Sequence, residues 1–131
     1  MDFIREVAYI RLIEANKNFK EFLAKKYDCN ANQVLLTCGS TGAIDAILNS
    51  VAIREYKQNK FPKLLLRQYE YYDIFKFSKL LNFNVITSKN DVGDLIKSIQ
   101  VNHPTIVYLS NPNNPTGKVL TENELVSVIE S

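Results

Sequence analysis

A glycine-rich segment, GSTGA at residues 39–43, lies between an apolar run and a stretch with helical spacing. Backbone N–H groups at the start of a helix point toward a bound ligand, and the helix dipole favours negative charge there. Ser40 and Thr41 add hydroxyl donors, so the segment is suited to binding a phosphate. Neither the P-loop spacing nor the dinucleotide-binding fingerprint is present. A glycine turn with an ordinary Ser or Thr N-cap is an equal alternative.

A second segment, SNPNNPTG at residues 110–117, directly follows the apolar run TIVYL. Ligands of parallel sheets collect outside the carboxyl ends of the strands, where this loop and the glycine-rich segment are both expected. Pro112 and Pro115 restrict the backbone, so an amide side chain between them has little entropy left to lose on binding. Clusters of Asn, Pro and Gly are, however, most often plain turns.

Three tyrosines, Tyr69, Tyr71 and Tyr72, follow the apolar run KLLLR and so also stand at the carboxyl end of an expected strand. Aromatic rings in this position could form a flat wall for a heteroaromatic ligand, although such residues more often belong to a core or an interface. Together the three segments predict a pocket for a phosphorylated aromatic ring. We expect Ser40, Tyr71 and Asn114 to line one concavity, at the joint carboxyl edge of the strands at 33–38, 63–67 and 105–109.

The elements that must position these segments alternate between helical and extended patterns. Apolar residues at three- and four-residue steps predict a helix over residues 2–27, with a break near 16–18, where Asn18 and Glu21 have the spacing of a capping box that would restart it. The apolar runs at 33–38, 63–67, 83–88 and 105–109 predict strands. Helical spacing follows at 43–57, 73–82 and 91–100, and Thr121 with Glu124 predicts the start of a last helix. In the helix at 73–82, the residues expected to point inward are Ile74, Phe77, Leu80 and Leu81.

Strands without polar alternation are buried on both faces, so the pattern predicts an α/β fold with a mostly parallel sheet and helices on both faces. A parallel unit that ends on a helix, with no following strand, looks incomplete. We therefore expect residues 1–131 to be a single partial domain, truncated at the C-terminus and at the N-terminus.

The composition fits a soluble globular chain: 131 residues, 46% hydrophobic and 23% charged. The net charge of +2 comes from scattered residues, which argues against a nucleic-acid partner. No apolar run approaches the roughly 20 residues that span a membrane. Cys29, Cys38 and the single His103 provide no metal-ligand spacing or disulfide framework, so a reduced, cytoplasmic setting is expected.

The sequence resembles the fold-type-I aminotransferases that use pyridoxal phosphate, in particular the class I/II branch that contains histidinol-phosphate aminotransferase. SNPNNPTG matches the Asn-Pro-x-Asn-Pro-Thr-Gly loop of that branch, GSTGAID matches its phosphate loop, and the resemblance extends from about residue 19 to residue 131. It implies that the chain is the first part of the large, cofactor-binding domain. It further implies a homodimer and a role in amino-acid biosynthesis.

The resemblance also implies roles for individual residues. Ser40, Thr41 and Gly42 would bind the phosphate of the cofactor, and Asn114 would bind the phenolic oxygen of its ring. Tyr71 would stack on the ring; because Tyr69 replaces the proline usual in the family, Tyr72 is the alternative. The resemblance and the aim of the amide both favour a cis bond between Asn114 and Pro115, an isomer found in about 5 to 6% of such bonds.

The implied activity is amino transfer between an amino acid and a keto acid, with histidinol phosphate or a related compound as a candidate substrate. The family's Schiff-base lysine, its ring-nitrogen aspartate and its substrate arginine cannot be placed on this sequence, so the 131-residue chain by itself is expected to be inactive. Three alternatives remain: a pyridoxal-phosphate-dependent decarboxylase of amino-acid phosphates, a non-catalytic sensor domain of a transcription regulator, and a generic phosphate- or nucleotide-binding α/β domain.

Overall fold

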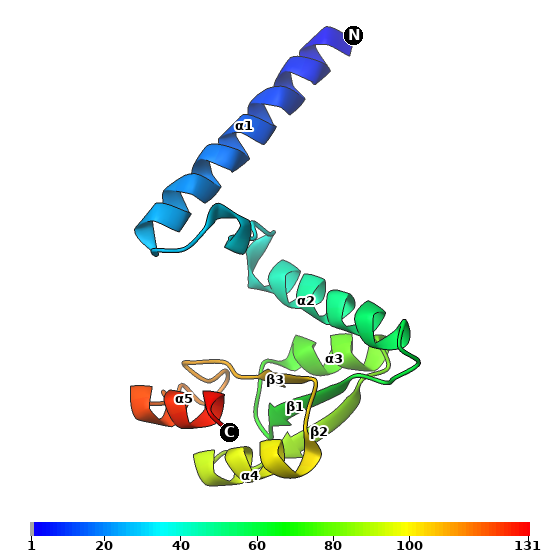
Figure 1. Cartoon of the computed structure of the whole chain (residues 1–131), viewed down its shortest axis with the longest axis vertical. Coiled ribbons are helices and arrows are strands. Elements are labelled where there is room, and N and C mark those ends of the chain that lie inside the picture. The colour runs from blue at the N-terminus through cyan, green and yellow to red at the C-terminus, as the bar shows by residue number, and fades with distance from the viewer. Residues whose placement is uncertain (1) are drawn as a thin grey trace. The chain divides into compact units, whose positions relative to one another are not determined.

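A computed structural model describes the backbone of residues 2–131 and the side chains of residues 13–131 (Figure 1). The chain forms two compact units, Met1–Ala43 and Ile44–Ser131. Helix α2 begins in the first unit and continues into the second. That the two units belong to a single partial domain stays a prediction.

The first unit is dominated by one continuous helix, α1 (Asp2–Lys26). The expected break near residues 16–18 is wrong, and so is the expected restart at Asn18. Asparagine costs at most about 0.7 kcal/mol in a helix relative to alanine, which a long run of hydrogen-bonded turns tolerates. A short 3₁₀ helix, η1 (Ala31–Gln33), follows, and the Gln33 side-chain oxygen accepts a hydrogen bond from the Asn30 backbone N–H at 2.8 Å.

The strand expected at residues 33–38 is also wrong. Gln33 belongs to η1, and the backbone hydrogen bonds described for this segment are local, from Val34 N to Ala31 O at 3.3 Å and from Gly39 N to Thr37 O at 2.9 Å. A strand exists only where a neighbouring strand supplies the complementary N–H and C=O groups. The apolar pattern of this segment has no such neighbour among the described residues.

The second unit contains a parallel sheet in the order β2-β1-β3, with Leu65 opposite both Ile86 and Val107. The expected parallel sheet is therefore confirmed. Its elements, in chain order, are α2 (Gly39–Tyr56), β1 (Lys63–Arg67), α3 (Tyr72–Leu80), β2 (Asn84–Ser88), α4 (Val92–Asn102), β3 (Ile106–Tyr108) and α5 (Glu122–Ile129) (Figure 1).

Helices cover both faces of this sheet, as expected. Successive residues of a strand point to opposite faces, so Leu64 and Leu66 of the central strand face one side and Leu65 the other, and all three are fully buried. The first face is covered by α2 and α3 through Leu48, Ala52 and Ile74. The second face is covered by α4 and α5 through Leu95 and Val128.

The helix ends follow the local sequence closely. Asp91 caps α4 by accepting a hydrogen bond from Asp94 N at 2.7 Å, and the capping box of Thr121 and Glu124 opens α5 as expected. Leu80, expected to point inward, is 70% exposed, because it lies six residues after Ile74, about 240° around the helix. None of the helices within residues 2–131 is long and apolar enough to cross a membrane.

Candidate functional site

The two connections that follow β1 and β3 leave the sheet at the same edge. The strands are parallel neighbours, and Leu66 pairs with Tyr108 at their carboxyl ends. Tyr71 follows β1 and Asn114 follows β3, so the sheet brings these two predicted site residues to one edge. The glycine-rich segment follows no strand and belongs to the first unit. Its approach to Tyr71 and Asn114 stays a prediction.

A buried ion pair joins these two connections. Arg67, the last residue of β1, donates from Nε to Glu70 Oε1 at 2.7 Å, and the two side chains are only 4% and 0% exposed. Arg67 Nη2 also donates to the carbonyl oxygen of Ser110 at 2.6 Å. The second oxygen of Glu70 accepts from Ser110 N at 3.1 Å and from the Ser110 hydroxyl. Both buried charges are therefore compensated, and the loop after β3 is tied to the loop after β1.

Asn113 stabilises the same loop, and every donor and acceptor of its side-chain amide is hydrogen-bonded. It is buried, and its Nδ2 donates to Tyr69 O at 2.8 Å and to Ser110 Oγ at 3.2 Å. Its Oδ1 accepts from Thr116 N at 3.3 Å and from Thr116 Oγ1 at 2.5 Å. This amide has no hydrogen-bonding capacity left for a ligand, so its role is to hold the loop.

The side chain of Asn114, the next residue, is exposed and not hydrogen-bonded within the described residues, in contrast to that of Asn113. The backbone N–H of Asn114 donates to Ser110 Oγ at 2.9 Å. Among the contacts described for residues 13–131, its side-chain amide has no partner and so remains available to a ligand. The bonds Asn111–Pro112 and Asn114–Pro115 are both cis, which confirms the expectation for the second bond; the first was not expected.

Tyr71 and Tyr72 differ in their surroundings. Tyr71 stands at the N-cap of α3, is half-buried, and its hydroxyl donates to Asp73 Oδ2 at 2.6 Å. Tyr72 is the first residue of the helix and is 76% exposed. A ring whose hydroxyl is fixed at one point loses less freedom when a ligand stacks on its face, which favours Tyr71 as the stacking residue.

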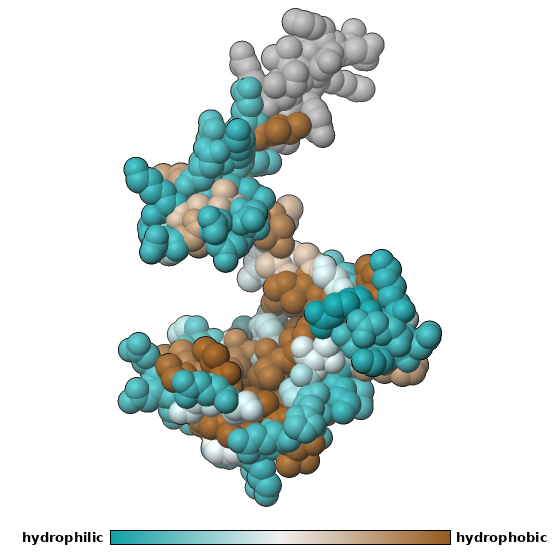
Figure 2. All heavy atoms as spheres, in the orientation of Figure 1, coloured by the Kyte–Doolittle hydropathy of each residue, from teal (hydrophilic) through white to brown (hydrophobic). Residues whose placement is uncertain are grey.

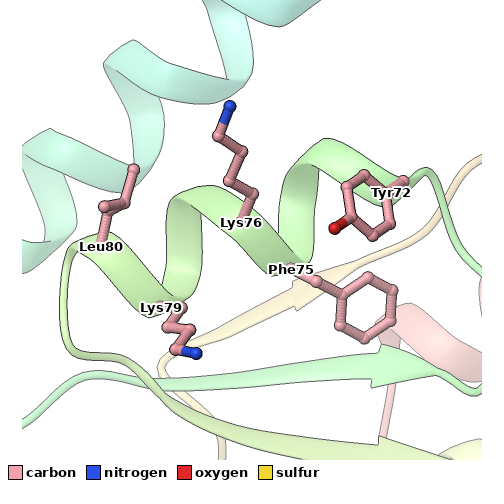
Figure 3. Close-up of a pocket in the computed structure, with 5 residues that line it drawn as sticks. All are labelled: Tyr72, Phe75, Lys76, Lys79 and Leu80. Carbon is pink, nitrogen blue, oxygen red and sulfur yellow. The ribbon is translucent and has the colours of Figure 1, made fainter.

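A surface hollow of about 510 Å³ lies along α3, lined by Tyr72, Phe75, Lys76, Lys79 and Leu80. Figure 3 shows that Lys76 and Leu80 project from one side of the helix and Phe75 and Lys79 from the other. Side chains spread around a single helix do not enclose an aromatic ring. Neither Tyr71 nor Asn114 lines this hollow, so it is separate from the candidate site.

Tyr108 lies on β3 beside the ion pair and packs against the first core. Burial raises the pKa of its phenol above the ordinary 10.0, and the charges of Glu70 and Tyr71 act in the same direction. Tyr108 thus lies close enough to Glu70 and Tyr71 for their charges to act on its phenol. The Tyr108 phenol also borders an apolar cavity of about 100 Å³.

The glycine-rich segment forms the first turn of α2, which begins at Gly39 and not at residue 43 as expected. Gly39 has φ +72°, and its carbonyl oxygen accepts from Thr37 Oγ1 at 2.8 Å. Ser40 is exposed and Thr41 half-buried. The first N–H groups of a helix lack partners within it, so this turn presents backbone donors together with two hydroxyl groups.

The sequence analysis missed the residues that hold the loop: Arg67, Glu70, Ser110 and Asn113. A signal was present in the arginine that ends an otherwise apolar strand, with a glutamate three residues later. A charge at the end of a buried strand needs a compensating partner, and the spacing of these two residues supplied one.

Known proteins resemble this chain in both sequence and fold. The family model "Aminotransferase class I and II" matches residues 8–131. The histidinol-phosphate aminotransferase of Pelagibacter ubique is 25% identical over 117 residues, which cover 86% of this chain and 31% of that protein. The chain therefore spans about a third of the length of such curated relatives.

Solved structures show the same fold. A putative histidinol-phosphate aminotransferase from Erwinia carotovora atroseptica superimposes with a TM-score of 0.74 at 26% identity, over 89% of this chain and 34% of that one. L-threonine-O-3-phosphate decarboxylase from Porphyromonas gingivalis superimposes with a TM-score of 0.71 at 21% identity, over 88% of this chain and 32% of that one. The second likeness shows the fold alone.

Proposed function

The chain belongs to the aminotransferase class I and II family, and we propose that it is the cofactor-holding part of an aminotransferase that uses pyridoxal phosphate. The observation that carries the proposal is the contrast between two neighbouring amides at the carboxyl edge of the sheet. Asn113 is buried and fully bonded, whereas the Asn114 side chain is exposed and unengaged on a loop that the buried ion pair holds in place.

The groups present fit this cofactor. Ser40, Thr41 and Gly42 would hold the phosphate through the donors in the first turn of α2. Asn114 would donate from its amide to the phenolic oxygen of the ring, and Tyr71 would cover the ring face. An anion, a phenolic oxygen and a flat ring are each matched by a side chain or backbone group of suitable chemistry.

Pyridoxal phosphate, when bound, supplies the electron sink for amino transfer between an amino acid and a keto acid. The residues of this chain bind and orient. The Asn114 amide would keep a hydrogen bond on the phenolic oxygen, and Tyr71, fixed through Asp73, would restrict tilting of the ring. The ion pair of Arg67 and Glu70 would keep the Asn114 and Tyr71 side chains in place when the ligand binds.

Titration of the ¹⁵N-labelled chain with pyridoxal phosphate tests this site. We expect weak, reversible binding that shifts the signals of the Asn114 side-chain amide and of Tyr71. Loss of the amide in Asn114→Ala should weaken binding about tenfold, the effect of one good hydrogen bond. The matched control is Asn123→Ala, which removes an exposed amide from α5. Equal affinities for the two variants would contradict the proposal.

Amino transfer is favoured over decarboxylation because the sequence relative reported above, from Pelagibacter ubique, is an aminotransferase. Histidinol phosphate is one candidate substrate. The 131-residue chain alone is expected to transfer no amino group, since none of its lysines lies in a matching family motif. Incubation with pyridoxal phosphate, borohydride reduction and mass spectrometry test this expectation. Stoichiometric labelling of one lysine together with amino transfer would contradict it.

A homodimer is part of the same proposal. Ile47 on α2 and Val126 and Ile129 on α5 are exposed, and Figure 2 shows hydrophobic side chains at the surface around α5. Contact with a second copy would remove such surface from water. Light scattering checks this, and a strictly monomeric species would contradict it. The cytoplasmic location stays a prediction.

A further inference from the structure

We infer that Arg67 and Glu70 are positioning residues, which set the place of the Asn114 amide relative to the Tyr71 ring. The inference rests on the proposed function, because it assigns these residues a role in holding the same cofactor. Neither residue needs to touch the ligand, since both are buried, Arg67 at the end of β1 and Glu70 in the connection that follows it.

The path between the two ligand-facing residues is short. Glu70 directly precedes Tyr71 in the chain, and its Oε2 accepts from both the backbone N–H and the hydroxyl of Ser110. Ser110 Oγ in turn accepts from Asn114 N at 2.9 Å. One carboxylate and one hydroxyl therefore connect the backbone of Tyr71 to the backbone of Asn114.

Arg67 closes this path into a rigid triangle. Its Nε contacts Glu70 and its Nη2 contacts the carbonyl oxygen of Ser110, at 2.7 Å and 2.6 Å. The guanidinium group is planar, so its two bonds fix the carboxylate and the loop carbonyl relative to each other. Rotation of the Glu70 side chain would break its bond from Arg67 and its two bonds from Ser110.

The energetics also indicate a positional role. A buried ion pair often contributes no more stability than apolar residues of similar volume would. Leucines occupy the preceding three positions of β1, so an apolar residue at position 67 would suit the strand equally well. The pair therefore does something that an apolar contact cannot, which is to direct hydrogen bonds at specified atoms of the loop.

The test compares Glu70→Gln with Glu55→Gln, which removes the carboxylate of the ion pair between exposed Arg54 and half-buried Glu55. The first readout needs no ligand. Amide hydrogen exchange at Ser110 and Asn114 should become about tenfold faster in Glu70→Gln and remain unchanged in Glu55→Gln, with the α4 amides as an internal reference. Unchanged exchange at Ser110 and Asn114 would overturn the inference.

The second readout is a double-mutant cycle on the dissociation constant for pyridoxal phosphate. Glu70→Gln should weaken binding about fivefold when Asn114 is present and have no further effect in Asn114→Ala, because Glu70 acts through Asn114. Equal weakening in both backgrounds would show a merely structural effect and overturn the inference. If the unmodified chain binds no pyridoxal phosphate, the proposed function fails, and the exchange readout alone decides the positioning role.

If Glu70→Gln does not fold, Ser110→Ala replaces it in both readouts. This variant removes the hydroxyl that links Glu70 to Asn114, and with it the acceptor of one Asn113 bond, and leaves the ion pair and the Ser110 backbone bonds in place. Faster exchange at Asn114 with the α4 amides unchanged, and weaker binding only when Asn114 is present, would support the inference. Wild-type exchange would overturn it.

Discussion

The loop at residues 110–117 and the turn at residues 37–42 present polar groups in contrasting ways. In the loop, Ser110 and Asn113 bond to side chains and backbone of the β1–α3 connection, 40 and 44 positions away in the chain. In the turn, the described hydrogen bonds join residues two positions apart, such as Thr37 Oγ1 to Gly39 O. The first region is shaped by tertiary contacts and the second by local backbone geometry.

This difference shows that backbone donors and a side-chain amide place different requirements on the structure around a ligand site. Backbone donors at the first turn of a helix point the same way whatever the rest of the protein does, so a phosphate site needs only the turn. A single side-chain amide must be aimed, and here a buried ion pair fixes the loop that carries it. Substitutions in the loop should therefore have larger effects on stability than substitutions in the turn.

The largest effect is expected for Arg67→Ala. It leaves the Glu70 carboxylate buried without its cation, which should lower the free energy of unfolding by about 3 to 5 kcal/mol. Arg54→Ala, which removes the exposed partner of the half-buried Glu55, should cost less than about 1 kcal/mol. Urea denaturation of both variants measures the difference. Similar midpoints would mean that the loop is not held by the ion pair.

Asn113 and Asn114 provide a sharper comparison within the loop. Asn113→Ala leaves Tyr69 O and the Thr116 donors without their partner, so we expect a loss of about 2 kcal/mol in unfolding free energy. Asn114→Ala removes an exposed amide and should change stability by no more than about 0.5 kcal/mol. Thermal and urea unfolding check both values. A large loss for Asn114→Ala would show that this amide has a structural role.

In the turn, Gly39 and Gly42 should respond in opposite directions. Gly39→Ala forces a Cβ into φ +72°, at a cost of about 1 to 2 kcal/mol, although no atom lies within 4 Å of that Cβ. At Gly42 a Cβ meets only Thr37 and Cys38 Cβ, at 3.5 and 3.8 Å, so Ala is accommodated and should add up to about 0.5 kcal/mol. Unfolding curves test this. A destabilised Gly42→Ala would indicate packing in the turn beyond these contacts.

The smallest effect concerns pH. The raised pKa of Tyr108 means that the unfolded chain releases this proton first, so the contribution of Tyr108 to stability is present below about pH 10 and is lost as the pH rises through the raised pKa. Tyr108→Phe should therefore lose less stability between pH 9 and pH 11 than the unmodified chain does. Urea unfolding at a series of pH values measures both slopes. Identical slopes would show that burial does not raise the pKa of Tyr108 in the folded chain.

Much of the fold could be predicted from the sequence because its signals are local. The run KLLLR is β1 residue for residue, the helical spacing at residues 91–100 corresponds to α4, and Thr121 begins α5 where its capping-box spacing with Glu124 indicated. The prediction of a strand at residues 33–38 was wrong because strand formation is not a local property. A strand depends on a partner elsewhere in the chain, and apolar β-prone residues do not specify one.

At the site, the sequence predicted which loops would carry ligand-binding groups, and its family resemblance pointed to Asn114 as the amide that would hold a ring oxygen. Only the tertiary structure decided that Asn113 is bonded throughout and that Arg67, Glu70 and Ser110 hold the loop. Residue types and spacing indicate which hydrogen bonds a side chain is able to form. Which partner it meets depends on strands that pair across some 40 residues of chain, and that pairing is visible only after folding.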